Sequence, residues 1–145
     1  MQKINFMKLT IPARSVNEGF SRTATAAFAA LTDPTVEELS DVKTAVSEAV
    51  TNCIVHAYGE QDGLIYIDAS LYEGGTLKIR IKDKGCGIPD VRKAREALYT
   101  TAGDERSGLG FTVMESFSDK LSVRSTVGRG TAVTITKYLK GKTAK

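Results

Sequence analysis

The chain has 145 residues, with 20 Lys and Arg against 17 Asp and Glu, a net charge of +3, and 41% hydrophobic content. This length predicts one domain with a sizeable core over residues 1–145 and leaves too little chain for two. The mildly basic balance comes without the Lys and Arg runs or interleaved aromatics of a nucleic-acid-binding protein. The basic end, about residues 139–145, is interpreted as a solvated tail.

The two cysteines, Cys53 and Cys86, lack the CxxC spacing of a metal or redox site, so we expect both to be reduced thiols. Residues 1–13 alternate in hydropathy and do not resemble a signal peptide. No apolar run is long enough to span a bilayer. These features predict a cytoplasmic protein that binds neither a membrane nor nucleic acid directly.

The first half of the chain predicts one strand and two helices. Alternating hydropathy predicts a strand at residues 6–13. Ser15 and Glu18 have capping-box spacing before a helix, and Thr35 and Glu38 have it before a longer helix that ends near residues 58–59. The apolar stripe expected along the first helix consists of Val16, Phe20, Ala24, Ala27, Phe28 and Leu31.

The second half predicts two hairpins separated by a loop and a helix. Residues 64–72 and 76–82 form the first hairpin, joined by a glycine-rich turn. Residues 83–89 form a loop, and residues 90–107 form a lid with a short helical turn near residues 91–98. A helix at residues 107–117 precedes a hairpin of residues 120–127 and 130–138. This order predicts a two-layer α/β sandwich, with a mixed, mostly antiparallel sheet and helices packed on one face.

Several catalytic motifs are missing from the sequence. There is no GxxxxGK[ST] phosphate loop, and the two Gly-x-Gly pairs, at residues 85–87 and 108–110, lack the third glycine of a dinucleotide-binding fingerprint. His56 is the one histidine in the sequence, and no GxSxG motif accompanies it. A zinc site built on histidines and a Ser-His-Asp triad are therefore disfavoured.

Three polar residues late in the long helix have the spacing of one helical face. Glu48, Asn52 and His56 follow one another at intervals of four residues. This face is either a solvated surface or the site of a metal-bound phosphate. The amide oxygen of Asn52 would suit Mg²⁺, which needs only one or two protein ligands when phosphates supply others.

Two further signals lie downstream. Asp83, at a strand end, either forms a turn or accepts a hydrogen bond from the exocyclic amine of a base, with Gly85 and Gly87 letting the ring lie against the backbone. Gly108 and Gly110 are either loop hinges or the start of a helix whose free N–H groups bind phosphate. Together, the three signals describe a nucleotide through its base, metal and phosphates.

These motifs resemble those of the GHKL ATPase and kinase superfamily. The similarity rests on Glu48-x-x-x-Asn52, Asp83-x-Gly85-x-Gly87-Ile88, Gly108-Leu-Gly110 and Gly130-Thr131. More closely, the chain resembles a family of sporulation anti-sigma factors that are also serine kinases. That similarity rests on Phe20-Ser-Arg22, Asp33-Pro-Thr35, Ser47-Glu-Ala-Val-Thr-Asn52, Thr100-Thr101, Glu105-Arg-Ser-Gly108 and Phe111-Thr-Val-Met-Glu115.

The resemblance implies a role for each matching residue. Glu48 would be the general base, Asn52 would bind Mg²⁺, and Asp83 would bind the adenine amine of ATP. Arg22 and Glu105 match partner-contact positions. The rest of the nucleotide site would consist of Gly85, Gly87, Ile88, Thr100, Thr101, Ser107, Gly108, Leu109, Gly110, Phe111 and Thr131.

The resemblance also implies a homodimer that inhibits a sporulation sigma factor in the ATP state and phosphorylates an anti-anti-sigma protein on serine with Mg-ATP. The chain departs from the family pattern at Cys53 and Cys86, and its segment 102–105 is one residue short. A stress-response sigma factor regulator and a nucleotide-gated binding module with little kinase activity remain alternatives. Glu48 disfavours the second, because a pure binder needs no carboxylate beside the phosphates.

Overall fold

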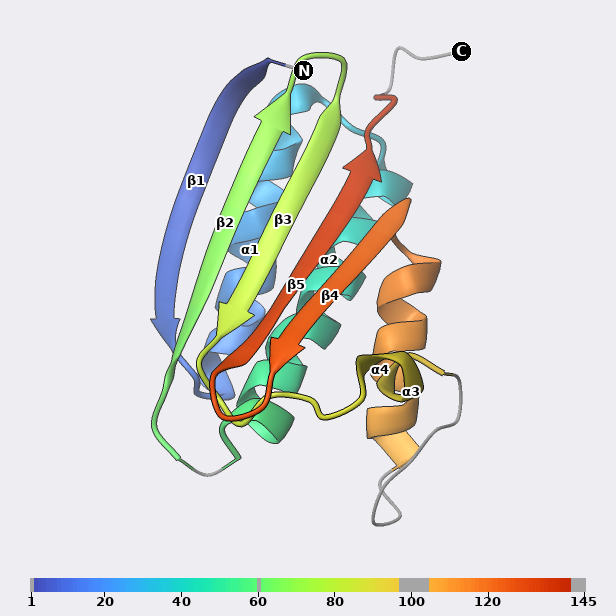
Figure 1. Cartoon of the computed structure of the whole chain (residues 1–145). Coiled ribbons are helices and arrows are strands. Elements are labelled where there is room, and N and C mark those ends of the chain that lie inside the picture. The colour runs from blue at the N-terminus through green and yellow to red at the C-terminus, as the bar shows by residue number, and fades with distance from the viewer. Residues whose placement is uncertain (1, 60, 97–104, 142–145) are drawn as a thin grey trace.

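The computed structural model describes residues 2–59, 61–96 and 105–141, the side chains of 105–109 excepted. It has two layers, a sheet and a group of helices behind it (Figure 1). The sheet has five strands in the order β1-β2-β3-β5-β4, and every pairing is antiparallel. The two-layer prediction is confirmed, and the sheet is antiparallel throughout rather than mixed. Its strands are β1 (Lys3–Pro12), β2 (Leu64–Tyr72), β3 (Thr76–Asp83), β4 (Lys120–Thr126) and β5 (Gly130–Tyr138).

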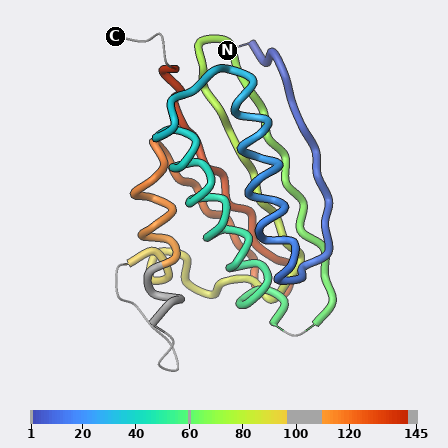
Figure 2. Tube along the Cα trace, turned by 180° about the vertical axis from the view of Figure 1, so that it is seen from behind, coloured from blue at the N-terminus to red at the C-terminus, as the bar shows by residue number. Residues whose placement is uncertain are grey.

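The helices cover one face of this sheet and leave the other face open. Figure 2 shows three long helices side by side on the covered face, with α2 between α1 and α4. Among the described residues, no helix is long and apolar enough to cross a membrane. The helices are α1 (Val16–Ala29), a 3₁₀ turn (Ala30–Thr32), α2 (Val36–Asn52), a π-helical turn (Cys53–Ala57), α3 (Val91–Ala94) and α4 (Glu105–Ser116).

The core lies between the sheet and α2. Alternate side chains of the central strands point toward the helices, as the alternating pattern predicts, and three valines of α2 meet them. Burying each such side chain stabilises the fold by about 1.5–3 kcal/mol. This packing holds α2 firmly on the sheet and so fixes the polar residues at its C-terminal end. The most deeply buried of these side chains are Ile65, Ile67, Leu77, Ile79, Ile81, Ile135, Val42, Val46 and Val50.

The capping box predicted at Ser15 is not formed. Ser15 has helical backbone angles, and its side chain makes no cap hydrogen bond. The carboxylate of Glu18 is used elsewhere: Oε1 accepts a 2.8 Å hydrogen bond from the Ser47 hydroxyl, and Oε2 lies 3.4 Å from Nε of Arg22. Ser47 of α2 thus binds the Glu18 carboxylate that the capping box with Ser15 would require.

The apolar stripe predicted along α1 is also wrong in part. Val16, Phe20 and Leu31 are 77%, 54% and 69% exposed, whereas Ser21 and Thr25 are fully buried. Both hydroxyls donate to backbone carbonyls within the helix, at 2.8 Å each, so that burying them leaves no unpaired polar group. Ser21 and Thr25 therefore face the core together with Phe28, whereas Val16, Phe20 and Leu31 face outward.

The capping box at the start of α2 is confirmed. The Thr35 hydroxyl accepts from the N–H of Glu38 at 3.0 Å, and Glu38 accepts from the N–H of Thr35 at 2.9 Å. Glu38 also accepts from the N–H groups of Lys140 and Gly141, just beyond β5. Partial burial raises the pKa of Glu38, but these backbone donors outweigh it and lower the pKa below its usual value.

Candidate nucleotide-binding site

A cavity of about 270 Å³ lies beside the C-terminal end of α2, next to the ends of β3 and β5. Its wall is mainly apolar with a few polar groups, which is typical of a small-molecule site. The lining residues used below are Asn52, Cys53, His56, Asp83, Gly87, Ile88, Phe111 and Thr131.

Asp83 is the polar residue buried most deeply in this wall, with 4% of its surface exposed. Its Oδ1 accepts hydrogen bonds from the N–H groups of Gly85, at 2.9 Å, and Thr131, at 3.2 Å. Its Oδ2 lies 3.5 Å from the thiol of Cys53, which is a weak donor. The carboxylate is therefore oriented by two backbone donors, and Oδ2 keeps the capacity to accept an amine hydrogen.

The loop after β3 needs its glycines because two other backbone segments approach it closely. A Cβ at Gly85 would overlap the carbonyl of Ala57, and one at Gly87 would overlap that of Thr126. Gly87 also has a φ of +78°, which disfavours other residues. The N–H of Ile88 then donates to the Ser125 hydroxyl at 2.7 Å, which holds Ile88 in the cavity wall.

The polar face of α2 meets α4 at Gly110. A Cβ placed on this buried glycine would lie 3.2 Å from Oδ1 of Asn52 and 3.6 Å from Oε2 of Glu48. Phe111, the next residue, lines the cavity. The structure thus brings together the helix-face, Asp83 and second Gly-x-Gly motifs, although they are about 30 residues apart in sequence.

The α-helix ends earlier than the predicted face requires. The turn Cys53–Ala57 is π-helical, and such turns are frequent at functional sites. Glu48 and Asn52 keep their α-helical spacing, whereas His56 lies in the wider turn and lines the cavity. The helical segment then stops near Gly59, whose φ of +61° agrees with the predicted end.

The helix predicted to open at Ser107 begins two residues earlier, at Glu105. The backbone N–H of Ser107 therefore lies in the first turn of α4, where N–H groups have no partner within the helix, whereas Gly108 and Gly110 lie beyond those positions. The side chains of Glu105, Ser107 and Leu109 lie outside the described part of the chain, as do Thr100 and Thr101.

Other site features were not predicted. Cys53 was expected only as a reduced thiol, and no sequence signal indicated its contact with Asp83, which depends on how α2 packs on β3. Ser125 connects two residues of the cavity wall. Its hydroxyl accepts a hydrogen bond from the N–H of Ile88 and lies 2.8 Å from the hydroxyl of Thr131. Arg22, by contrast, lies on α1 and is half exposed beside Glu18.

The comparisons with known proteins agree with this architecture. Residues 11–137 match the family model of the histidine kinase-like ATPase domain. The RsbU and RsbW domains of Rv1364c from Mycobacterium tuberculosis superpose with a TM-score of 0.69 at 19% identity, over 94% of this chain and 33% of that one. A histidine kinase domain from Erythrobacter litoralis superposes with a TM-score of 0.56 at 22% identity, over 84% and 61%. The chain therefore belongs to the histidine kinase-like ATPase domain family and has its fold.

Sequence relatives narrow the family further. The anti-sigma F factor of Thermoanaerobacter pseudethanolicus is 51% identical over 140 residues, covering 96% of this chain and 97% of the relative. That of Clostridium beijerinckii is 53% identical over 135 residues, covering 92% and 94%. The chain therefore belongs to the anti-sigma F factor family.

Proposed function

We propose that this protein binds Mg-ATP in the cavity beside α2, inhibits a sporulation sigma factor, sigma F, in the ATP state, and phosphorylates an anti-anti-sigma protein on serine. The observation that carries this proposal is that Asp83 and Asn52 line one cavity, while Glu48, one turn before Asn52, approaches Gly110 of α4 beside it. Membership of the anti-sigma F factor family supports the choice of partners.

The residues divide the work between binding and chemistry. Asp83 accepts a hydrogen from the adenine amine through Oδ2, because its other oxygen is already occupied by backbone donors. The amide oxygen of Asn52 would hold Mg²⁺; bound there, the ion neutralises charge on the phosphates. The described residues contain no cluster of three or more His, Cys, Asp or Glu that could hold a metal, which agrees with a site completed by phosphates and water.

Glu48 would act as the general base. It accepts the proton of the serine hydroxyl while the serine oxygen bonds to the γ-phosphorus and the bond to ADP breaks. This role is supported by its position one turn before Asn52 on the same helix face, where its Oε2 would lie 3.6 Å from a Cβ placed on Gly110 of α4. The remaining catalytic contribution is positioning, which the packed core beneath α2 supplies.

The surface that contacts the protein partners is proposed to include Arg22 and Glu105. The protein itself is proposed to form a homodimer. Arg22 is held by Glu18, and Glu18 accepts from Ser47, the residue directly before the general base. This chain of contacts gives a physical route between α1 and the nucleotide site. Sigma F affinity should therefore differ between the ATP, ADP and nucleotide-free states, and equal affinity in all three would contradict the inhibitory mechanism.

Phosphate transfer from γ-labelled Mg-ATP to an anti-anti-sigma protein tests the kinase. Glu48→Gln should lower the transfer rate about 10²–10⁴-fold and leave ATP affinity unchanged. Glu37→Gln makes the same change on the exposed first turn of α2 and is the matched control. If the Glu48→Gln variant still transfers phosphate at the original rate, Glu48 is not the general base. ATP binding without transfer by the unchanged protein would favour the nucleotide-gated binding module.

A further inference from the structure

The open face of the sheet gathers basic side chains that are dispersed in the sequence. Side chains alternate along each strand, so the residues between the buried apolar ones point away from the helices. The register places Lys82 of β3 level with Arg124 of β4, and Lys78 level with Lys120, with β5 between each pair. We define the basic sheet face as Lys78, Arg80, Lys82, Lys120 and Arg124.

These five cations have few anionic neighbours. None of them forms an ion pair with a carboxylate of the described residues. Two carboxylates at the rim are engaged elsewhere: Glu115 pairs with Arg95 at 3.4 Å, and Asp119 accepts from the N–H of Tyr138 at 2.7 Å. Asp68 of β2, opposite Arg80, is the exception within the face. The face is therefore strongly positive although the whole chain carries only +3.

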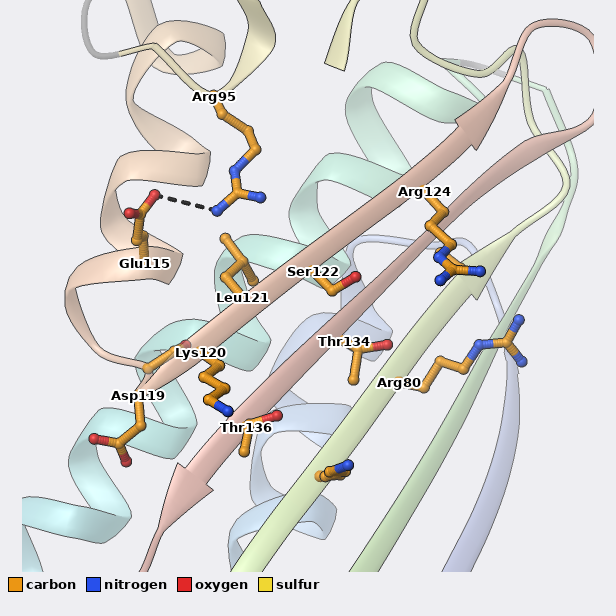
Figure 3. A pocket seen from close by; sticks show the side chains of 13 residues that line it. Arg80, Arg95, Glu115, Asp119, Lys120, Leu121, Ser122, Arg124, Thr134 and Thr136 are labelled. Atoms are coloured by element: carbon orange, nitrogen blue, oxygen red, sulfur yellow. Dashed lines mark hydrogen bonds and ion pairs between the residues drawn. The ribbon is translucent and has the colours of Figure 1, made fainter. Parts of the chain in front are cut away.

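The face is hollowed and rich in hydroxyl groups. An open hollow of about 710 Å³ lies over β3, β5 and β4 and extends past the edge of β4 to Arg95. Figure 3 shows Arg80 and Arg124 on this hollow, with the hydroxyls of Ser122 and Thr134 beside them. Hydroxyl donors between cations suit an anionic ligand with several oxygen atoms.

Aromatic rings border the same face on β2. The ammonium group of Lys84 lies 5.1 Å from the ring centre of Tyr66, and that of Lys78 lies 5.6 Å from the ring of Tyr72. Tyr66 stands opposite Lys82 in the register. Rings on a sheet, flanked by cations, are the arrangement on which single-stranded nucleic acids stack their bases.

We propose, contrary to the expectation from the composition, that the basic sheet face binds single-stranded nucleic acid, its phosphates on the cations of β3 and β4 and its bases toward the tyrosines of β2. A protein partner fits less well. The described positions that face outward between Lys78 and Lys82, and those level with them on β5 and β4, include no large apolar side chain. Protein interfaces are apolar at their centre, whereas nucleic-acid interfaces are more polar and far more positive.

The test is fluorescence anisotropy with labelled single-stranded DNA and RNA of about 15 nucleotides, at low salt and with saturating Mg-ADP to block the nucleotide cavity. Arg80→Glu combined with Arg124→Glu reverses two charges of the face. Arg14→Glu combined with Lys43→Glu makes the same charge change at exposed positions outside this face and is the matched control. If the reversed pair does not fold, Arg80→Gln with Arg124→Gln replaces it.

The face pair should weaken binding at least tenfold, and the control pair no more than about threefold, since only the former removes phosphate contacts. With four cations engaged, the logarithm of affinity should fall with the logarithm of salt with a slope of about −3. Absence of binding at low salt, or equal weakening by both pairs, would overturn the proposal. Equally tight binding of poly-glutamate of matched charge would assign the face to acidic proteins instead.

Discussion

The thiol of Cys53 lies 3.5 Å from Oδ2 of Asp83 within the wall of the cavity beside α2, and both residues are buried. Burial, and then the nearby carboxylate of Asp83, raise the pKa of the Cys53 thiol well above its usual value. The thiol therefore stays protonated and donates weakly to the oxygen proposed to bind the adenine amine. A weak donor at this position holds the carboxylate without competing strongly with the nucleotide.

Replacing Cys53 with serine should reduce ATP affinity. A hydroxyl is a stronger donor than a thiol, so it competes with the adenine amine for Oδ2 of Asp83. The expected loss is about three- to tenfold, corresponding to about 1 kcal/mol. Isothermal titration calorimetry would measure it. Cys53→Ala, which removes the donor, should bind ATP at least as tightly as the unchanged protein, and a serine variant with unaltered affinity would contradict the competition.

The same thiol should make stability fall at alkaline pH. Because its pKa is raised in the folded state, the unfolded chain loses the proton first, above about pH 8.5, while the folded protein retains it. The free energy of unfolding should then decrease by up to about 1.4 kcal/mol per pH unit. Cys53→Ala should remove this slope in urea titrations, whereas Cys86→Ala, at the exposed cysteine, should keep it.

Asp83→Asn should weaken ATP binding about 10- to 100-fold. The new amide must keep an oxygen toward the N–H groups of Gly85 and Thr131, so its NH₂ group faces the cavity and meets the adenine amine donor to donor. Titration with a fluorescent ATP analogue would detect the loss. Asp68→Asn, the same change on the open sheet face, is the control. Similar affinities for both variants would exclude Asp83 as the adenine contact.

Asn52→Ala should weaken binding of Mg-ATP more than binding of ATP without magnesium, because it removes the proposed amide ligand of the ion. A loss of about tenfold or more is expected in the presence of Mg²⁺. Nucleotide titrations with Mg²⁺ and with EDTA separate the two effects. Thr51, the neighbouring polar residue, is not among the residues that line the cavity and provides the control Thr51→Ala. An identical loss in both buffers would make Asn52 a contact of the nucleotide rather than of the metal.

The substitution Gly110→Ala should affect the binding of Mg-ATP and the stability of the fold differently. Alanine favours the helix by up to about 1 kcal/mol over glycine, but its Cβ would lie 3.2 Å from Oδ1 of Asn52 and displace that amide. We expect reduced Mg-ATP affinity without a matching loss in thermal stability. Gly19→Ala, in α1, meets only Arg22 at 3.5 Å and should leave nucleotide binding unchanged. Unaltered affinity in Gly110→Ala would show that Asn52 adjusts freely.

Much of this architecture follows from the sequence, because local patterns carry it. Alternating hydropathy located the five strands to within a few residues, since side chains on a strand must alternate between core and solvent. The box of Thr35 and Glu38 started α2 correctly because its hydrogen bonds join residues only three apart. Helical spacing also predicted Glu48 and Asn52 as site residues, and the position at a strand end before Gly85 and Gly87 predicted Asp83.

Other features depended on contacts between distant segments. Glu18 does not form the predicted cap, because its carboxylate accepts a hydrogen bond from Ser47. Ser21 and Thr25 lie on the buried face of α1, where their hydroxyls donate to carbonyls within the helix. Neither of these features can be predicted from a local sequence pattern. The contact of Cys53 with Asp83 likewise exists only because α2 packs across the end of β3.

The basic sheet face likewise depends on the tertiary structure and not on a local sequence pattern. The sequence contains no run of Lys and Arg, because inward-pointing residues such as Ile79 and Ile81 separate Lys78, Arg80 and Lys82. The sequence by itself determined which residues alternate and which motifs a nucleotide requires. Strand pairing, which places β4 beside β5 and β5 beside β3, decided that these charges share one face, and the packing of α2 and α4 decided that the motifs share one cavity.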